Sequence, residues 1–350
     1  MSKSKLTLII DGNWLLMSRM SVMQTRYTNP TQMCKDLKIL MIKSINIVLR
    51  QFGDIDNIIF VADGGSWRNH VEIPDFLKDE DVEYKGNREP DPGIDWDIVW
   101  AMYEDFIAKF NQNGITAVKE TSIEGDDWCW YWSNKLNKEG TNVIIWSKDK
   151  DLTQLVNTDS DGCFTVCWNK DTGIVTTERN DSEMDFLFNM QFNINEDLYN
   201  SLVDKSKEVI HINPKAIVID KIIRGDAGDN IFPIIQRKSK TSNSDRVYRV
   251  SQKDLDVTID IHNEQSYGEY IQNLLNSKSY AGRVDKQYAE IIEHFKYNKR
   301  LVALEESSYP EEVLAIMRKY DTYNCCKNTA EVEYQINAEA NQISSILDFI

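Results

Sequence analysis

The sequence has few cysteines, and none is arranged as a zinc site or a redox pair. It contains no CxxC pair and no Cys/His set with the spacing of zinc ligands. We therefore expect its thiols to be buried or incidental, in a protein that stays in a reducing cytoplasm. The six cysteines are Cys34, Cys129, Cys163, Cys167, Cys325 and Cys326.

Long hydrophobic runs are also missing. The N-terminal residues MSKSKLTLII enter an apolar strand without a signal-peptide core, and no segment reaches about 18 apolar residues. Internal repeats and low-complexity tracts are absent as well. We expect a soluble, cytoplasmic protein without membrane contact, whose 350 residues with 41% hydrophobic content suffice for a substantial core.

Positive charge is in deficit. Forty Lys and Arg stand against 56 Asp and Glu, which leaves a formal net charge of −16. A nucleic-acid binder is expected to carry a positive footprint. Net charge is a sum, however, and carboxylates gathered around metal ions can make a protein acidic while a local basic surface contacts phosphates. The charge therefore weighs only weakly against a nucleic-acid partner.

What is present is an alternation of strand and helix patterns over the first two-thirds of the chain. Apolar runs that end in acids predict strands, and 3.6-residue periodicity predicts helices between them. This order predicts an α/β fold with a mainly parallel central sheet flanked by helices. The expected strands are 6–11, 57–63 and 142–151, and the expected helices are 32–52, 94–113 and one that opens at Glu124.

The pattern changes near residue 220. Residues 217–235 read as a helix that then breaks, and the rest of the chain is largely helical. We expect three regions: an α/β domain at 1–220, a helical region at 221–340 and a tail at 341–350.

Nine acidic residues recur in short motifs at the ends of the predicted strands and helices. In α/β sheets, functional groups gather at the carboxyl ends of the strands. The spacing of three pairs suggests that their carboxylates point the same way. Two pairs are at i,i+3 on one helical face: Glu124 with Asp127, and Asp226 with Asp229. The third pair, Asp149 with Asp151, lies along an expected extended strand end. The nine are Asp11, Asp63, Glu124, Asp126, Asp127, Asp149, Asp151, Asp226 and Asp229.

Each acidic motif alone is equally explained by a helix cap or a turn. Together they form a set of oxygen ligands that favours Mg²⁺ or Mn²⁺ over zinc. Two such ions about 4 Å apart would stabilise the attacking and leaving oxygens of a phosphodiester displacement.

The ordered series of motifs resembles the flap endonuclease/5′→3′ exonuclease family, over roughly residues 6–325. Within it, the chain is most similar to the T-even-type phage branch called RNase H, which removes RNA primers from lagging-strand fragments. The motifs are IIDGN (9–13), FVADG (60–64), YKGNR (84–88), EGDD (124–127), SKDKDLTQL (147–155) and RGDAGDN (224–230).

The resemblance implies a PIN-like 5′-nuclease fold and a structure-specific 5′→3′ exonuclease/flap endonuclease with a two-metal mechanism. The implied substrates are branched or RNA-primed duplex DNA in phage-type lagging-strand replication. A monomer in the host cytoplasm is expected, with a sliding clamp and a single-strand DNA-binding protein as candidate partners.

The resemblance also assigns the site residues. Two Mg²⁺ ions are implied, with Mn²⁺ as a substitute. Asp63, Glu124, Asp126 and Asp127 match the acids around the first metal, which Asp11 would hold through water; Asp149, Asp151, Asp226 and Asp229 match those of the second.

YKGNR matches the family's basic motif at the foot of a helical arch, expected at about 68–115. Lys85 and Arg88 would contact the scissile phosphate, and Tyr84 would stack on a displaced base. For Arg68, a phosphate contact and a structural salt bridge remain equal alternatives.

Two features depart from the family pattern. Residues 69–83 form a long acidic insertion, which puts the start of the arch in doubt. No Pro-Gly-rich hairpin module follows GDAGDN, which puts the family's K⁺ site in doubt. A basic segment, 236–253, stands there instead. It is either a solvated loop or a duplex contact made by Arg237, Lys238, Lys240, Arg246 and Arg249.

The tail QISSILDFI (342–350) has two readings. It is either an amphipathic turn docked on the body or a clamp-binding peptide acting through Ile346, Leu347 and Phe349.

Two other functions remain open. A PIN-like ribonuclease would use the same sheet with fewer acids, and would lack the YKGNR motif and the basic segment. A non-catalytic replication adaptor would keep the fold, but unused buried carboxylates are costly.

Overall fold

The computed structural model describes most of the chain between residues 5 and 322. Residues outside the description are 1–4, 24–26, 28, 53–54, 79, 81, 90, 159–161, 178–192, 206–207, 239–246 and 323–350. Within the described residues, no helix combines the length and apolar character needed to cross a membrane. The four described cysteines, Cys34, Cys129, Cys163 and Cys167, are free and buried.

The chain forms two compact units, neither of which is continuous in sequence. The first comprises Met1–Ser66, Asp91–Ile212 and Glu312–Ile350, and the second comprises Trp67–Pro90 and Asn213–Glu311. This division differs from the linear one suggested by the sequence, because segment 67–90 clusters with the region after residue 212.

The first unit is built on an eight-stranded sheet in the order β3-β2-β1-β4-β6-β7-β8, with β5 paired to β6. Most neighbours are parallel; only the β5–β6 and β6–β7 pairs are antiparallel. The predicted mainly parallel sheet is therefore confirmed. The strands are β1 (Lys5–Asp11), β2 (Asn57–Val61), β3 (Thr116–Val118), β4 (Thr141–Trp146), β5 (Asn157–Thr158), β6 (Phe164–Asn169), β7 (Gly173–Thr177) and β8 (Val209–Ile212).

Strand β1 is central because both of its faces are apolar and buried. It pairs with β2 on one side and β4 on the other, so Ile10 lies beside both Phe60 and Trp146. This register brings the carboxyl ends of β1, β2 and β4 to one edge of the sheet.

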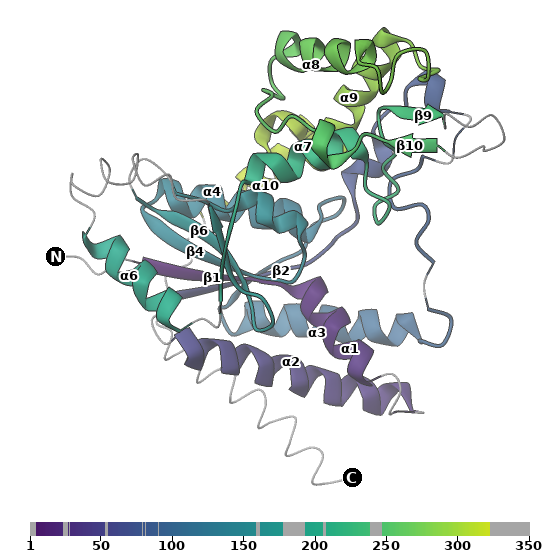
Figure 1. The fold of residues 1–350 in the computed structure, drawn as a ribbon. Coiled ribbons are helices and arrows are strands. Elements are labelled where there is room, and N and C mark those ends of the chain that lie inside the picture. Colours follow the sequence, from purple (N-terminus) through teal and green to yellow (C-terminus); the bar gives the residue numbers. More distant parts are fainter. Residues whose placement is uncertain are drawn as a thin grey trace. The chain divides into compact units, whose positions relative to one another are not determined.

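Helices cover both faces of this sheet (Figure 1). The apolar sides of α1, α2 and α3 share one core with alternate residues of β1, such as Leu6 and Leu8. Helix α4 lies against the opposite face. The helices are α1 (Gly12–Met23), α2 (Pro30–Phe52), α3 (Trp96–Gln112), α4 (Gly125–Lys138), α6 (Asn193–Asp204) and the short η3 (Asp151–Leu155). Helix α10 (Glu311–Arg318) begins at the last residue of the second unit.

The second unit is mainly helical around its own core. Ile222, Ile271 and Phe295, from three different helices, are fully buried there, and Leu77 from segment 67–90 packs into the same cluster. Its elements are η1 (Trp67–His70), η2 (Asp75–Leu77), α7 (Pro214–Arg224), β9 (Gln236–Lys238), β10 (Val247–Arg249), η4 (Gln252–Asp254), α8 (Glu264–Asn276), α9 (Tyr288–Val302) and η5 (Glu306–Ser308).

Candidate active site

Seven of the nine predicted acids belong to the first unit, where they follow β1, β2 and β4 or open α4. We call them the strand-end group. They are Asp11, Asp63, Glu124, Asp126, Asp127, Asp149 and Asp151.

Asp11 is the last residue of β1 and is only 5% exposed. Its carboxylate accepts hydrogen bonds from the Ser147 hydroxyl at 2.7 Å and from the Trp14 backbone N–H at 2.9 Å. Burial nevertheless raises the pKa of Asp11 to about 7, and the negative charges of Asp63 and Asp149 add to that rise. Ionised Asp11 is therefore costly unless a cation lies nearby.

Asp63, two residues past β2, has both carboxylate oxygens held. The side-chain amide of Asn13 and the backbone N–H of Gly125 each donate to it at 2.6 Å. Asn13 is oriented in turn, since its amide oxygen accepts from the Asp63 N–H and from the Tyr103 hydroxyl. The position of Gly125 suits this contact because an added Cβ would lie 3.0 Å from the Asp63 carboxylate.

The start of α4 supplies the next acids. Glu124 is the N-cap residue, is 6% exposed and accepts from the Ser66 hydroxyl at 2.8 Å. Asp127 is fully buried and accepts from the Glu124 backbone N–H at 3.0 Å, which caps the helix. Asp126 on the same turn is partly exposed.

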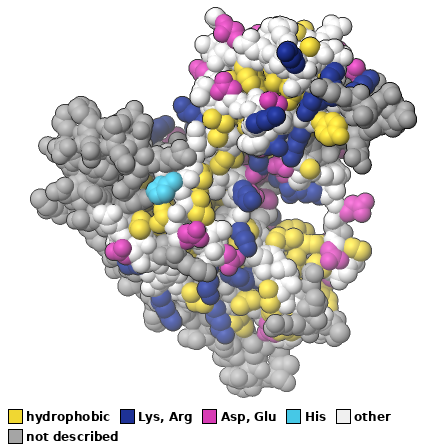
Figure 2. Space-filling view, in the orientation of Figure 1, with side chains coloured by type: hydrophobic (Ala, Val, Ile, Leu, Met, Phe, Trp, Pro, Cys, Tyr) yellow, Lys and Arg dark blue, Asp and Glu magenta, His cyan; other side chains and the backbone are white. Residues whose placement is uncertain are grey.

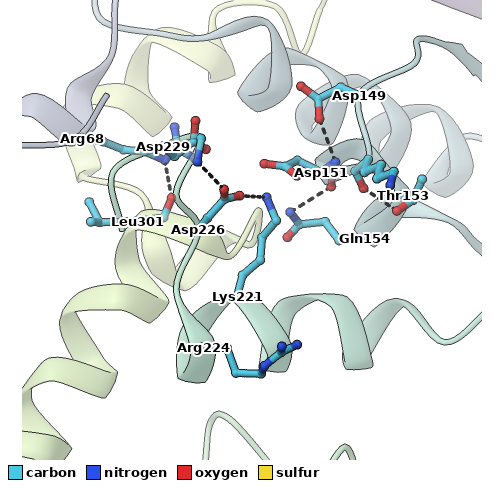
Figure 3. Close-up of polar contacts among 12 residues, drawn as sticks. Arg68, Asp149, Asp151, Thr153, Gln154, Lys221, Arg224, Asp226, Asp229 and Leu301 are labelled. Carbon is cyan, nitrogen blue, oxygen red and sulfur yellow. Dashed lines mark hydrogen bonds and ion pairs between the residues drawn. The ribbon is translucent and has the colours of Figure 1, made fainter. Parts of the chain in front are cut away.

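The residues after β4 form a turn. The expectation that Asp149 and Asp151 lie along an extended strand was wrong, because β4 ends at Trp146 and Asp151 opens η3. The Asp149 carboxylate accepts from the Asp151 N–H at 2.9 Å, which closes an Asx turn (Figure 3). The Ser147 hydroxyl, which donates to Asp11, also accepts from the Asp149 N–H at 2.9 Å.

The remaining two acids, Asp226 and Asp229, belong to the second unit, in residues 225–230, which we call the carboxylate loop. They were expected on one helical face, which was wrong: α7 ends at Arg224, and Gly225 turns the chain with a φ of 71°. A Cβ at Gly225 would lie 2.3 Å from the Ile231 carbonyl oxygen, so only glycine fits this turn.

Cations neutralise the carboxylates of this loop. Lys221 pairs with Asp226 (Figure 3), and Arg88 pairs with Asp229 at 2.5 Å. Burial acts to raise the pKa of Asp226, but the ion pair with Lys221 and backbone N–H donors outweigh it and hold that pKa below its ordinary value. Lys221 was not predicted from the sequence, where its signal is its position on α7, five residues before Asp226.

The YKGNR motif forms a tight turn in the second unit, residues 83–88, which we call the Lys85 turn. Lys85 has a φ of +56°, a left-handed conformation that costs a non-glycine residue about 1–2 kcal/mol. Its ammonium lies 5.0 Å from the centre of the Tyr84 ring. Tyr84 and Lys85 are half-buried, whereas Arg88 is exposed.

Arg68 lies in the interior of the second unit at 3% exposure. Its guanidinium donates to the Leu301 carbonyl at 2.8 Å (Figure 3). It lies 4.6 Å from the centre of the Trp67 ring and 5.9 Å from that of the Tyr84 ring. Of the two alternatives for Arg68, this buried placement suits a structural role.

In the basic segment β9 and β10 pair antiparallel, and we call this pair the basic hairpin; residues 239–246 lie outside the described residues. Arg237 is half-buried between Tyr280 at 5.0 Å and Tyr248 at 5.8 Å, while Lys238 and Arg249 are exposed. Figure 2 shows Lys and Arg side chains on the face that carries this hairpin and α7. Lys240, Arg246 and the tail residues Ile346, Leu347 and Phe349 lie outside the described residues.

Three residues that donate hydrogen bonds to carboxylates of the strand-end group were also not predicted from the sequence: Asn13, Ser66 and Ser147. Asn13 and Ser147 lie inside the IIDGN and SKDKDLTQL motifs, so motif position was the available signal. The metal-ligand atoms that the strand-end group offers are carboxylate oxygens, which suit Mg²⁺ or Mn²⁺. Asp11 is buried close to the negative charges of Asp63 and Asp149, and a bound divalent cation would stabilise its ionised form.

Comparisons with known proteins agree with this geometry. The family model described as 5′-3′ exonuclease, N-terminal resolvase-like domain, matches residues 6–185. A curated 5′-3′ exonuclease of Buchnera aphidicola subsp. Acyrthosiphon pisum is 26% identical over 140 residues, covering 39% of this chain and 43% of the relative. The chain thus spans less than half the length of that relative.

Solved structures share the fold. The T5 D15 protein co-crystallized with metal ions has a TM-score of 0.51 at 16% identity, covering 91% of this chain and 98% of the other. T5 5′-exonuclease with bound zinc has the same TM-score and coverage at 14% identity. Because the family model spans more than half of the sequence and the PIN-like 5′-nuclease fold agrees, the chain belongs to the 5′-3′ exonuclease family.

Proposed function

We propose that this protein is a divalent-metal-dependent 5′ nuclease that hydrolyses phosphodiesters in branched or RNA-primed duplex DNA. The observation that carries the proposal is the strand-end group, in which buried Asp11 lies among the charges of Asp63 and Asp149. Membership of the 5′-3′ exonuclease family supports the same chemistry.

The strand-end group would hold the metal through carboxylate oxygens. Bound divalent ions would activate water and stabilise the charge that develops on the phosphate oxygens. The chain's own contribution is orientation: Asn13 and the Gly125 N–H fix both oxygens of Asp63, and Ser147 ties Asp11 to the Asp149 turn. Fixed ligands need no reorganisation during the reaction, which is the source of their catalytic effect.

The family resemblance adds residues of the Lys85 turn and the carboxylate loop to those proposed to act in the reaction. Lys85 is proposed to contact the scissile phosphate, and Tyr84, whose ring packs beside that ammonium, to stack on a displaced base. Asp226 and Asp229 are the two acids that the family resemblance adds to the metal ligands.

The biological role follows from the family resemblance. We propose two Mg²⁺ ions, with Mn²⁺ as a substitute, and removal of RNA primers and flaps in phage-type lagging-strand replication. The protein would act as a monomer in the host cytoplasm, with the exposed Lys238 and Arg249 of the basic hairpin contacting duplex DNA. Binding of a sliding clamp through Ile346, Leu347 and Phe349, and contact with a single-strand DNA-binding protein, are parts of the same proposal.

One assay tests the proposed activity. A labelled 5′-flap duplex, an RNA-primed DNA duplex and single-stranded RNA are each incubated with the protein, with and without Mg²⁺. We expect Mg²⁺-dependent cleavage of the first two. Cleavage of single-stranded RNA alone would assign a PIN-like ribonuclease, and binding without cleavage in either condition would assign a replication adaptor.

A further inference from the structure

Two asparagines, which have no assigned role in the reaction, connect the Lys85 turn to the carboxylate loop. We propose that Asn87 and Asn230 are positioning residues that fasten these two segments together. The carboxylate loop would then hold Lys85, the cation proposed to contact phosphate, in position. The inference rests on the proposed function and names residues on which its chemistry depends.

The two asparagine contacts are reciprocal. Asn87, in the Lys85 turn, donates its side-chain amide to the Ala227 carbonyl of the carboxylate loop at 2.9 Å. Asn230, in the carboxylate loop, donates its amide to the Glu83 carbonyl of the Lys85 turn, also at 2.9 Å. Each side chain thus crosses to the other segment's backbone, over about 140 residues of intervening chain.

The backbone contributes a third contact at the residue that matters most. The Lys85 N–H donates to the Asp229 carbonyl at 2.9 Å. Lys85 and Asn230 both have left-handed backbones, with φ values of 56° and 58°, and lysine gains nothing locally from that conformation. The contacts with the carboxylate loop therefore stabilise a backbone conformation that Lys85 would not favour by itself.

The turn leaves little room for adjustment. The Gly86 N–H donates to the Glu83 carbonyl at 2.9 Å, and a Cβ at Gly86 would lie 2.9 Å from the Cβ of Glu83. Arg88 adds a fourth attachment, through Nε to the Gly228 carbonyl at 3.2 Å and through its ion pair with Asp229. A shift of either segment would therefore move the other.

Asn87 is exposed, so its amide can be removed without opening a cavity in the core. Different results are then expected if Asn87 only stabilises the fold and if it positions Lys85. A positioning residue acts through Lys85, so its loss should slow the reaction while DNA affinity stays constant. It should also add nothing once Lys85 itself is gone.

The experiment is a double-mutant cycle on a labelled 5′-flap duplex with Mg²⁺, measured as single-turnover rate at saturating enzyme. Asn87→Ala is expected to slow cleavage by ~10- to 100-fold, since small misplacements of catalytic groups have effects of that order. Asn87→Asp, which keeps the shape but loses the donor, should match it. Asn230→Gly, which keeps the left-handed backbone, should act in the same direction. In a Lys85→Ala background, none of these changes should slow the reaction further.

Three measurements accompany the rates. DNA affinity in Ca²⁺ should stay within about twofold of wild type. Hydrogen exchange at the Lys85 amide should be slow in wild type and fast in Asn87→Ala, because the segment is released. The matched control, Asn276→Ala, replaces an exposed asparagine at the end of α8 in the same unit and should change neither quantity.

Additive losses in the Lys85→Ala background, an equal loss of DNA affinity, or unchanged rates in the asparagine variants would each overturn the inference. If wild-type protein fails to cleave the substrate, the proposed function is what fails. The hydrogen-exchange comparison still decides whether Asn87 and Asn230 fasten the Lys85 turn.

Discussion

The two carboxylate regions of this protein are stabilised in opposite ways. In the strand-end group, Asp11 is buried among other acids and is held by a hydroxyl and a backbone N–H, so its pKa rises to about 7. In the carboxylate loop, Lys221 pairs with Asp226 and holds its pKa below the ordinary value. Both regions contain aspartates in turns, but burial sets the direction of the pKa shift at Asp11, whereas at Asp226 the ion pair with Lys221 and backbone N–H donors outweigh burial.

This difference separates two roles for acidic residues. Carboxylates that are fixed by neutral donors and repel one another gain from an external cation. Carboxylates already paired with Lys or Arg gain less, since a metal must compete with the ion pair. We therefore expect a divalent cation to stabilise ionised Asp11 more than it stabilises Asp226, which is already paired with Lys221.

The largest expected effect is on catalysis. Asp63→Asn removes one charge and keeps the size of the side chain, and it loses one of the two hydrogen bonds from Asn13 and Gly125 because its NH2 group cannot accept. Loss of a metal ligand forfeits several kcal/mol of transition-state stabilisation, or about 10³-fold or more in rate. Single-turnover cleavage of a 5′-flap duplex in Mg²⁺ measures this, with DNA affinity in Ca²⁺ expected to be retained.

Cleavage by Asp63→Asn at the wild-type rate would contradict the role of Asp63 as a metal ligand. A loss of DNA affinity equal to the loss of rate would mean that Asp63 serves binding and not chemistry.

A second prediction concerns stability without metal. The pKa of Asp11 is raised by folding from 3.8 to about 7, so the favourable contribution of its protonated form is complete below about pH 4 and is lost as pH rises through 7. Asp11→Asn should therefore stabilise the metal-free protein at pH 8, by at most a few kcal/mol. Urea unfolding in EDTA at pH 5 and pH 8 measures the difference.

The gain in the free energy of unfolding should be smaller at pH 5, where wild-type Asp11 is mostly protonated. The control, Asp97→Asn at an exposed position on α3, should show no such pH dependence. A gain that is equal at both pH values, or a loss at pH 8, would contradict the assignment of the cost to a buried charge.

The smallest expected effect is in the carboxylate loop. A double-mutant cycle with Lys221→Met and Asp226→Asn should give a favourable coupling of about 1 kcal/mol, as the two side chains are 16% and 23% exposed. The exposed pair Lys296–Glu264 in the same unit, 54% and 63% exposed, serves as the control and should couple weakly. Equal couplings in the two pairs would remove the contrast on which the comparison depends.

The sequence was sufficient for three neighbouring parallel strands of the sheet and for the acids at or just after the ends of two of them. Apolar runs identify β1, β2 and β4 because parallel strands are buried on both faces, and Asp11 and Asp63 follow from the ends of those runs. Glu124 was correctly read as the start of a helix. These features depend on local pattern alone.

Features that depend on turns or on contacts distant in sequence were not predictable. The helical reading of Asp226 and Asp229 failed because Gly225 ends α7, and Asp149 and Asp151 form an Asx turn where a strand was expected. Asn13 contacts Asp63 across 50 residues, and periodicity carries no information about such pairs.

The central claim is that the strand-end group binds a divalent metal. Calorimetric titration of Mn²⁺ into the metal-free protein, without DNA, tests it most directly when wild type and Asp63→Asn are compared. We expect wild type to have at least one Mn²⁺ site that Asp63→Asn lacks, or at which Asp63→Asn binds Mn²⁺ at least tenfold more weakly. Indistinguishable Mn²⁺ binding by the two proteins would contradict it.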